Sequence, residues 1–153
     1  MGKALSQRIK QSRFESSAHE AMLNLMVASD HVRRRLDEVC EPYGITHTQY
    51  NVLRILKGAY PKGYPRKEIV KRMLEAAPDV TRLLTRLEKR GLVARSESLS
   101  DRRWSVAHIT RKGLALLDKM KPAISQLTSL ISNRMSESDQ RHFSTLCEKL
   151  YRD

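Results

Sequence analysis

The most informative segment of the chain is Pro78–Gly113, which reads PDVTRLLTRLEKRGLVARSESLSDRRWSVAHITRKG. Its first part has four apolar residues at the i, i+3, i+4 and i+7 spacing of one helical face: Val80, Leu83, Leu84 and Leu87. Pro78 suits the first turn of such a helix, where its missing N–H costs nothing, and Gly91 suits the position just after the helix. The segment therefore predicts an amphipathic helix that ends before Gly91.

The opposite face of this helix carries hydroxyl groups and cations: Thr81, Arg82, Thr85, Arg86 and Lys89. Groups of these kinds donate hydrogen bonds to DNA phosphates and to base edges. A charged face is about as common on a helix that meets only solvent. The helix alone therefore does not distinguish a DNA-reading surface from a solvated one.

A hairpin is predicted after the helix. Residues 92–94 suit a short first strand, residues 95–100 a polar, turn-like segment, and residues 104–110 a second strand. The tripeptide Asp101-Arg102-Arg103 lies between the strands. Guanidinium groups at the tip of a thin hairpin can enter a narrow minor groove, whose negative potential attracts arginine. Thr110 is placed to cap the helix that follows.

The positive charge is concentrated in the same region. The chain carries a net charge of +12, and residues 66–112 contribute +7 of it, with 13 Lys and Arg against 6 Asp and Glu. A basic surface of this kind suits phosphate binding. The sequence has no apolar run long enough to span a bilayer and no signal-peptide pattern, so we expect a cytoplasmic protein without a membrane partner.

The flanking sequence predicts further helices. Three motifs have the spacing of capping boxes: Ser17-x-x-Glu20, Thr46-x-x-Gln49 and Ser136-x-x-Asp139. Residues 57–65 read as a loop, and residues 66–74 as a short helix with three apolar side chains directed inward: Ile69, Val70 and Met73. Pro122 is expected to bend a long helix without ending a domain.

These motifs resemble those of the MarR family, bacterial regulators with a winged helix-turn-helix. The matching residues are Val80-Thr81-Arg82, Leu87-Glu88-Lys89-Arg90-Gly91-Leu92-Val93, Arg95, Asp101-Arg102-Arg103 and Ile109-Thr110-Arg111-Lys112-Gly113. The resemblance extends over about residues 16–152. One departure is that Glu75, Ala76 and Ala77 precede Pro78 where the family often has a serine cap, so we expect a weakly capped recognition helix.

The expected fold is mainly α with a small β-hairpin wing, that is, a winged helix-turn-helix with a helical dimerisation region. Residues 1–15 are expected to form a flexible basic arm and residues 16–44 the N-terminal helix of the dimerisation region. Residues 45–112 are expected to form the DNA-binding domain and residues 113–153 the C-terminal helices. A small DNA-binding head cannot cover all these apolar helix faces, so a homodimer is the physical expectation, and the resemblance implies one as well.

We expect a regulator, typically a repressor, that binds double-stranded DNA at a pseudo-palindromic operator. The expected major-groove contacts come from Asp79, Thr81, Arg82, Thr85, Arg86 and Lys89. The expected wing contacts come from Arg95, Asp101, Arg102 and Arg103, with Asp101 orienting Arg103 or Arg95 rather than facing a phosphate. By resemblance, a small aromatic or anionic effector binds between the helical region and the head, at residues that the sequence does not identify.

Two other functions stay open at this stage: a sequence-indifferent architectural DNA-binding protein, and a ligand or thiol-based redox switch. Cys40 ends a helix and Cys147 lies inside one, which favours structural thiols over oxidant sensors. The five histidines have no ligand-type residue three or four positions further on: His19, His31, His47, His108 and His142. We therefore expect no metal or cofactor and, in the absence of a catalytic motif, no enzyme activity.

Overall fold

The computed structural model describes residues 3–11, 13–76, 79–97 and 105–152. The elements are α1 (Lys3–Ile9), α2 (Ser17–Cys40), the 3-10 turn η1 (Glu41–Tyr43), α3 (His47–Gly58), β1 (Tyr64–Pro65), α4 (Arg66–Arg72), α5 (Val80–Lys89), β2 (Val93–Glu97), β3 (Ser105–Ile109), α6 (Arg111–Ser132) and α7 (Glu137–Tyr151). The expected mainly helical class with a small sheet is confirmed.

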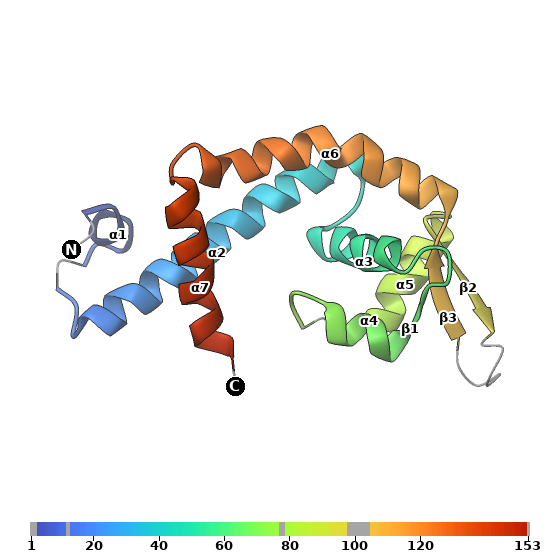
Figure 1. The fold of residues 1–153 in the computed structure, drawn as a ribbon, viewed down its shortest axis with the longest axis horizontal. Helices are drawn as coiled ribbons and strands as arrows, with labels where there is room; N and C mark the ends of the chain where they lie inside the picture. Colours follow the sequence, from blue (N-terminus) through green and yellow to red (C-terminus); the bar gives the residue numbers. More distant parts are fainter. Residues whose placement is uncertain (1–2, 12, 77–78, 98–104, 153) are drawn as a thin grey trace.

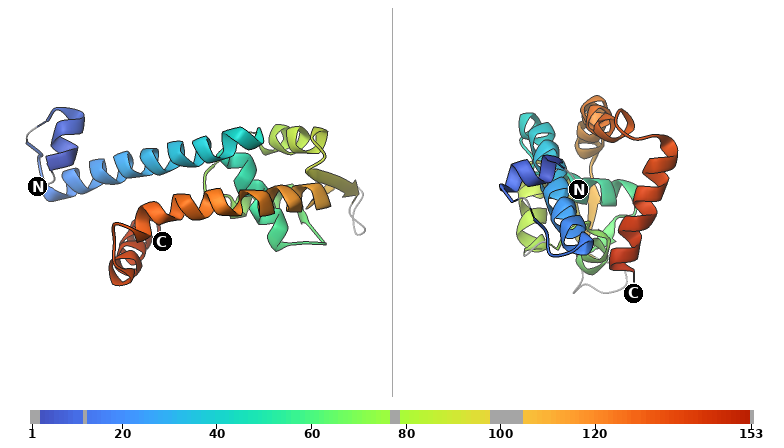
Figure 2. Two further views of the ribbon diagram at one scale, coloured as in Figure 1. Left: turned by 90° about the horizontal axis from the view of Figure 1, so that it is seen from above. Right: turned by 90° about the vertical axis from the view of Figure 1, so that its left-hand side faces the viewer.

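The molecule has a compact head at one end of a helical arm (Figure 1). The head consists of α3, α4, α5 and the sheet, and the helices α2 and α6 run side by side away from it. Figure 2 shows that α1 and α7 lie near the far end of this arm, at the opposite end of the molecule from the sheet. The described residues thus form a head and a helical arm, and the residue bounds expected for a DNA-binding domain and a dimerisation region stay a prediction.

The sheet has three antiparallel strands in the order β1-β3-β2. Val93 pairs with Ile109 at the base of the hairpin, and Tyr64 pairs with Ala107 on the other side of β3. The expected two-stranded ribbon is thus incomplete, because residues 64–65 of the predicted loop form a third strand. The first hairpin strand also continues to Glu97, into the segment predicted to be turn-like.

The core of the head is formed where the apolar stripe of α5 meets α3, α4 and the sheet. The largest fully buried side chains include Leu53, Leu56, Ile69, Leu87 and Ile109. Burying one such side chain stabilises the fold by roughly 1.5–3 kcal/mol. The stripe predicted for α5 is confirmed, since Val80, Leu84 and Leu87 are buried and Leu83 is half-buried.

Two of the three predicted capping boxes occur in the structure, and the cap of the first long helix lies one residue earlier than predicted. The capping boxes Thr46/Gln49 and Ser136/Asp139 are confirmed. The first long helix is capped by Ser16, whose Oγ accepts the His19 N–H at 3.1 Å, and not by Ser17.

The prediction of a weakly capped recognition helix is wrong. The Oδ1 atom of Asp79 accepts the backbone N–H of Arg82 at 2.8 Å and caps α5, which begins at Val80. A capping carboxylate at a helix N-terminus stabilises the helix by about 1 kcal/mol and also interacts favourably with the helix dipole. The expected place of Pro78 in the first turn lies outside the described residues.

Two further expectations differ from the structure. The flexible arm predicted for residues 1–15 contains the helix α1, in which Leu5 is only 3% exposed. Val70 was expected to point inward from α4, but 47% of it is exposed. Helix α6 continues through Pro122, so this proline does not end a domain, as predicted.

The start of α6 lies so close to the hairpin that only glycine fits at position 113. A Cβ on Gly113 would lie 2.4 Å from the Leu92 carbonyl oxygen and 2.6 Å from Cγ1 of Ile109. We therefore expect Gly113→Ala to lower the free energy of unfolding by about 1–3 kcal/mol in urea titrations. Gly58→Ala is the matched control, because a Cβ there meets nothing within 4 Å. Equal stability of the two variants would contradict the tight helix–hairpin contact.

Candidate nucleic-acid interface

Helix α5 presents a polar surface on the side opposite its buried stripe. Thr81, Arg82, Arg86 and Lys89 are exposed on this helix, while Leu84 and Leu87 anchor it in the core. A rigid helix with outward guanidinium and hydroxyl groups has the chemistry needed to contact base edges and phosphates in a major groove. The structure brings these predicted contact residues together, and their contacts with DNA stay a prediction.

Thr85 differs from its neighbours on the predicted face. It is half-buried, its hydroxyl donates to the Thr81 carbonyl oxygen at 3.0 Å, and Nη2 of Arg95 donates to its Oγ1 at 3.3 Å. The hydroxyl proton of Thr85 is therefore already used within the protein. A base could meet Thr85 only through the methyl group or by donating to the hydroxyl oxygen, and a phosphate, which has no donor, only through the methyl group.

Arg95 connects the wing to the recognition helix. Its Nε donates to Oε2 of Glu88 at 2.9 Å, and Nη2 pairs with the same carboxylate. The hydrogen bond from Arg95 lowers the pKa of Glu88, and this carboxylate in turn raises the pKa of Arg95. Arg95 thus braces β2 against α5, a role that the sequence did not indicate. Its contact with DNA stays a prediction, and Asp101, Arg102 and Arg103 lie outside the described residues.

The C-terminal end of α5 is held by a second arginine. The Arg90 guanidinium donates to the Tyr43 carbonyl oxygen at 2.9 Å and also to the carbonyl of Gly44. The ammonium group of Lys112 donates to the Arg90 carbonyl at 2.8 Å. Arg90 therefore fixes the end of the recognition helix to the corner between α2 and α3. The sequence does not indicate this role, because the carbonyls that Arg90 contacts lie 46 and 47 residues earlier in the chain.

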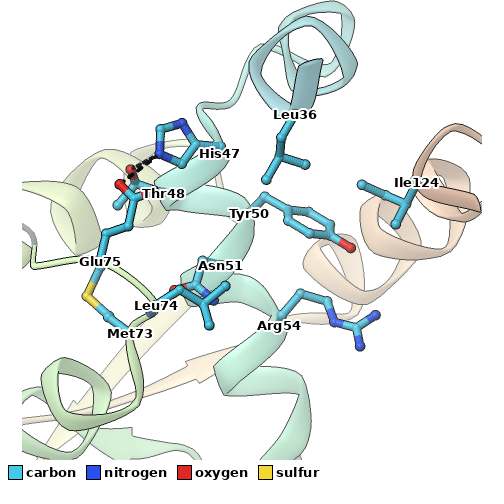
Figure 3. Close-up of a pocket in the computed structure, with 10 residues that line it drawn as sticks. All are labelled: Leu36, His47, Thr48, Tyr50, Asn51, Arg54, Met73, Leu74, Glu75 and Ile124. Atoms are coloured by element: carbon cyan, nitrogen blue, oxygen red, sulfur yellow. Dashed lines mark hydrogen bonds and ion pairs between the residues drawn. The ribbon is translucent and has the colours of Figure 1, made fainter. Parts of the chain in front are cut away.

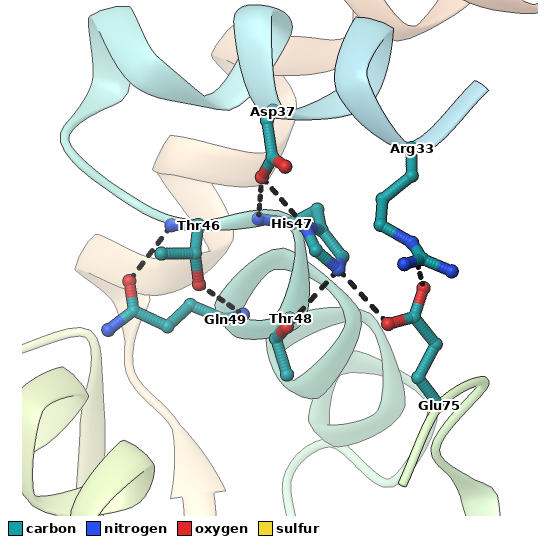
Figure 4. A network of polar contacts seen from close by, with 7 residues as sticks. All are labelled: Arg33, Asp37, Thr46, His47, Thr48, Gln49 and Glu75. Atoms are coloured by element: carbon teal, nitrogen blue, oxygen red, sulfur yellow. Dashed lines mark hydrogen bonds and ion pairs between the residues drawn. The ribbon is translucent and has the colours of Figure 1, made fainter. Parts of the chain in front are cut away.

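The N-terminal side of α5 is connected to α2 by a network around His47 (Figure 4). The His47 Nδ1 lies 2.7 Å from Oδ1 of Asp37 on α2, and Nε2 lies 3.3 Å from Oε2 of Glu75 in the segment before α5. Nε of Arg33 pairs with Oε1 of Glu75 at 3.2 Å. Partial burial acts to lower the pKa of His47, but hydrogen bonds with the two carboxylates outweigh it and raise this pKa above its ordinary value.

A pocket of about 340 Å³ lies between the arm and the head (Figure 3). Leu36 of α2 and Ile124 of α6 form its apolar side, while α3 contributes Tyr50 and Arg54. Residues 73–75 close the remaining side, where Leu74 N–H donates to Oδ1 of Asn51 at 3.1 Å. The pocket thus combines an apolar wall with one guanidinium group, at the boundary where the resemblance implies a ligand.

Other site chemistries receive little support from the described part of the chain. No group of three or more potential metal ligands occurs among residues 3–11, 13–76, 79–97 and 105–152. Cys40 is fully buried, and burial raises the pKa of its thiol to about 11, which disfavours a reactive thiolate. In the same residues, no helix is long and apolar enough to cross a membrane.

The paired helices α4 and α5 and the adjoining hairpin define a winged helix-turn-helix protein. The MarR family profile matches residues 45–104. Over 114 residues, the chain is 31% identical to the HTH-type transcriptional regulator MhqR of Bacillus subtilis, a match that covers 71% of this chain and 74% of MhqR. The chain belongs to the MarR family of DNA-binding transcriptional regulators.

Solved structures share the same fold. Sco3205, a MarR family transcriptional regulator from Streptomyces coelicolor in complex with DNA, matches with a TM-score of 0.80 and 20% identity over 92% of this chain and 90% of that chain. CouR from Rhodococcus jostii bound to p-coumaroyl-CoA matches with a TM-score of 0.75 and 20% identity over 90% of this chain and 95% of that chain. At these identities the two structures support the fold alone.

Proposed function

We propose that the protein is a homodimeric repressor that binds a pseudo-palindromic operator and is released by a small aromatic or anionic ligand. The observation that carries this proposal is the exposed polar face of α5, on a helix capped by Asp79 and fixed at its other end by Arg90. A reading helix with both ends fixed meets DNA with little ordering cost.

The DNA contacts divide between two elements. Arg82 and Arg86 of α5 contact base edges in the major groove, while Thr81 and Lys89 add phosphate contacts. Arg102 and Arg103 of the wing enter the adjacent minor groove, where arginine is favoured by the narrow groove's potential. Asp79 acts first as the helix cap, and Thr85 contributes mainly by supporting Arg95.

The far end of the arm supplies the dimer interface. Large apolar side chains are exposed on α2, α6 and α7: Met22, Leu25, Met26, Val32, Ile131, Phe143, Leu146, Leu150 and Tyr151. A monomer rarely leaves so many apolar side chains in water on adjoining elements. A second copy that covers them places two heads on one face of the DNA, each on one half-site.

The pocket between arm and head is the proposed effector site. Tyr50 offers a ring for stacking, Leu36 and Ile124 offer apolar contact, and Arg54 offers a cation for a carboxylate. The aromatic acyl group in the CouR complex illustrates a ligand of this chemistry in a protein of the same fold. A ligand wedged here would favour one spacing of the two heads over another, which is a shift between two states.

Arg54→Ala is expected to weaken binding of an aromatic carboxylate about tenfold, because a charged hydrogen bond contributes roughly 1.5–3 kcal/mol. The measurement is calorimetric titration of the full chain with benzoate and with p-coumarate. Lys57→Ala is the matched control, since it removes one cation from the same helix but does not line the pocket. Equal losses in the two variants would refute the carboxylate role of Arg54.

The repressor proposal is tested by footprinting on the DNA upstream of the gene and by a reporter under that promoter. We expect two protected half-sites about one helical turn apart, and loss of protection when five base pairs are inserted between them. Expression of the reporter is expected to rise when the gene that encodes this protein is deleted. Uniform protection along the fragment, or an unchanged reporter, would favour an architectural protein instead.

A further inference from the structure

The recognition helix is joined to the α2–α3 corner at both of its ends, by two attachments of different chemistry. Arg90 donates to backbone carbonyls, so this attachment involves no histidine and no carboxyl group. The attachment before α5 passes through His47, which contacts Asp37 of α2 and Glu75 in the preceding segment. Histidine is the side chain whose charge ordinarily changes near neutral pH. The Arg90 attachment therefore has no titrating histidine. The attachment before α5 also includes the Arg33–Glu75 ion pair, so only its part through His47 can be titrated.

The charged groups near His47 come from every element around it. Asp37 and Arg33 lie on α2, and Glu75 approaches from the segment before α5 (Figure 4). Across the adjoining groove of about 450 Å³ lie the capping residue Asp79 and, on α5, Arg82 and Arg86. Arg54, on the same helix as His47, lines the pocket on the other side.

The two carboxylates have the strongest effect on the imidazole. Asp37 lies 2.7 Å and Glu75 3.3 Å from its two ring nitrogens, whereas no cation makes a direct contact with the ring among the described interactions. An imidazolium donates from both nitrogens and can serve both carboxylates at once, but a neutral imidazole has only one N–H. Protonation therefore converts a single hydrogen bond into a two-sided, charged bridge.

We propose that His47 is a positioning residue whose protonated form ties α2 to the segment before the recognition helix and thereby strengthens operator binding. The inference rests on the proposed DNA-binding function and adds a proton-dependent control to it. The bridge restricts where α5 sits relative to the helical arm. A head whose position is already restricted loses less conformational entropy when it binds, so its affinity for the operator rises.

The sign of the pH dependence follows from linkage. The folded-state pKa of His47 is raised, so its bridge is fully formed below the ordinary histidine pKa of about 6.5 and is lost as the pH rises through the raised value. Because the protonated form is the one proposed to position the head, operator affinity is expected to fall as the pH rises above about 6.5. Since His47 and Glu75 also line the pocket, a ligand there disturbs the same bridge.

The bridge itself is tested without DNA. In the full chain, an NMR titration is expected to give His47 a pKa above the ordinary histidine value of about 6.5. The protection factors of the Leu74 and Glu75 amides, which are exchange rates corrected for the intrinsic effect of pH, are expected to rise as His47 becomes protonated. Glu75→Gln should lower the pKa of His47 and remove this change in exchange. A His47 with the ordinary histidine pKa of about 6.5, or protection factors that do not change with pH in the wild type, would overturn the proposal.

The consequence for DNA is tested with a specific duplex and a scrambled duplex at constant salt from pH 6 to pH 8. The wild type is expected to bind the specific duplex at least about threefold more tightly at pH 6 than at pH 8, relative to the scrambled duplex. This difference in affinity between pH 6 and pH 8 should disappear in His47→Gln, decrease in Glu75→Gln and persist in the exposed control His142→Gln. If His47→Gln keeps the difference, the positioning role is refuted. Absence of specific binding at every pH, with the NMR result intact, would instead refute the DNA-binding proposal.

Discussion

The double substitution Phe143→Asp/Leu146→Asp is expected to convert the protein into a monomer and to weaken operator binding by at least about 100-fold. Both side chains are 44% exposed on α7, far from the DNA-reading helix. If these side chains pack against a second copy, the two carboxylates would be buried there without partners, and this strongly destabilises the dimer. A monomer then binds each half-site alone and loses the benefit of joined heads.

The measurement pairs sedimentation velocity with titration of the operator. Ser138→Asp with Thr145→Asp is the matched control, because it adds the same charge at exposed positions on the other side of the same helix. The control is expected to remain dimeric and to keep its affinity. A dimeric Phe143→Asp/Leu146→Asp protein with normal binding would remove α7 from the proposed interface.

Arg86→Ala is expected to reduce binding to the operator by roughly 10-fold to 100-fold, and binding to scrambled DNA much less. The reason is that a well-placed arginine at a base edge contributes about 1–3 kcal/mol of discrimination, whereas a phosphate contact lowers all affinities alike. Arg86 is exposed on α5 and lies on the same face of the helix as Arg82, four residues earlier. The variant should also keep its stability, because the buried stripe of the helix is unchanged.

Arg134→Ala provides the comparison for charge alone. Arg134 is exposed and follows the C-terminal end of α6, and Figure 1 shows that this end of the helix lies away from the head. It removes one positive charge and should affect operator and scrambled DNA equally little. Equal proportional losses on the two duplexes for Arg86→Ala would mean that Arg86 contacts only phosphates. The reading role would then pass to another residue of α5.

The elements that could be predicted are those whose signal is local. The buried stripe of α5 follows from four apolar residues at helical spacing, and the capping boxes at Thr46 and Ser136 follow from residues three positions apart. The strand at residues 64–65 could not be predicted, because two residues show no alternation and one of them is proline. The cap of α5 differs from the prediction because a proline in the first turn would put the capping residue before Pro78, whereas the helix begins at Val80 and is capped by Asp79.

The contacts that organise the candidate site are not local. Arg95 and Glu88 both suit a polar surface, and only the packing of β2 on α5 turns them toward each other. Asp37, His47 and Glu75 are 10 and 28 residues apart along the chain and meet only once the head is folded against the arm. The pocket likewise combines residues of α2, α3 and α6 that show no shared motif.

The most direct test of the account is the affinity of the full chain for the best duplex selected from a random library, compared with a scrambled duplex of equal length across a range of salt. We predict a pseudo-palindromic selected sequence and an affinity gap of about a thousandfold, with both affinities falling as salt rises. A difference in affinity below about tenfold, with the same salt dependence for both duplexes, would contradict sequence-specific regulation. It would identify a protein that contacts only the phosphate backbone of the DNA.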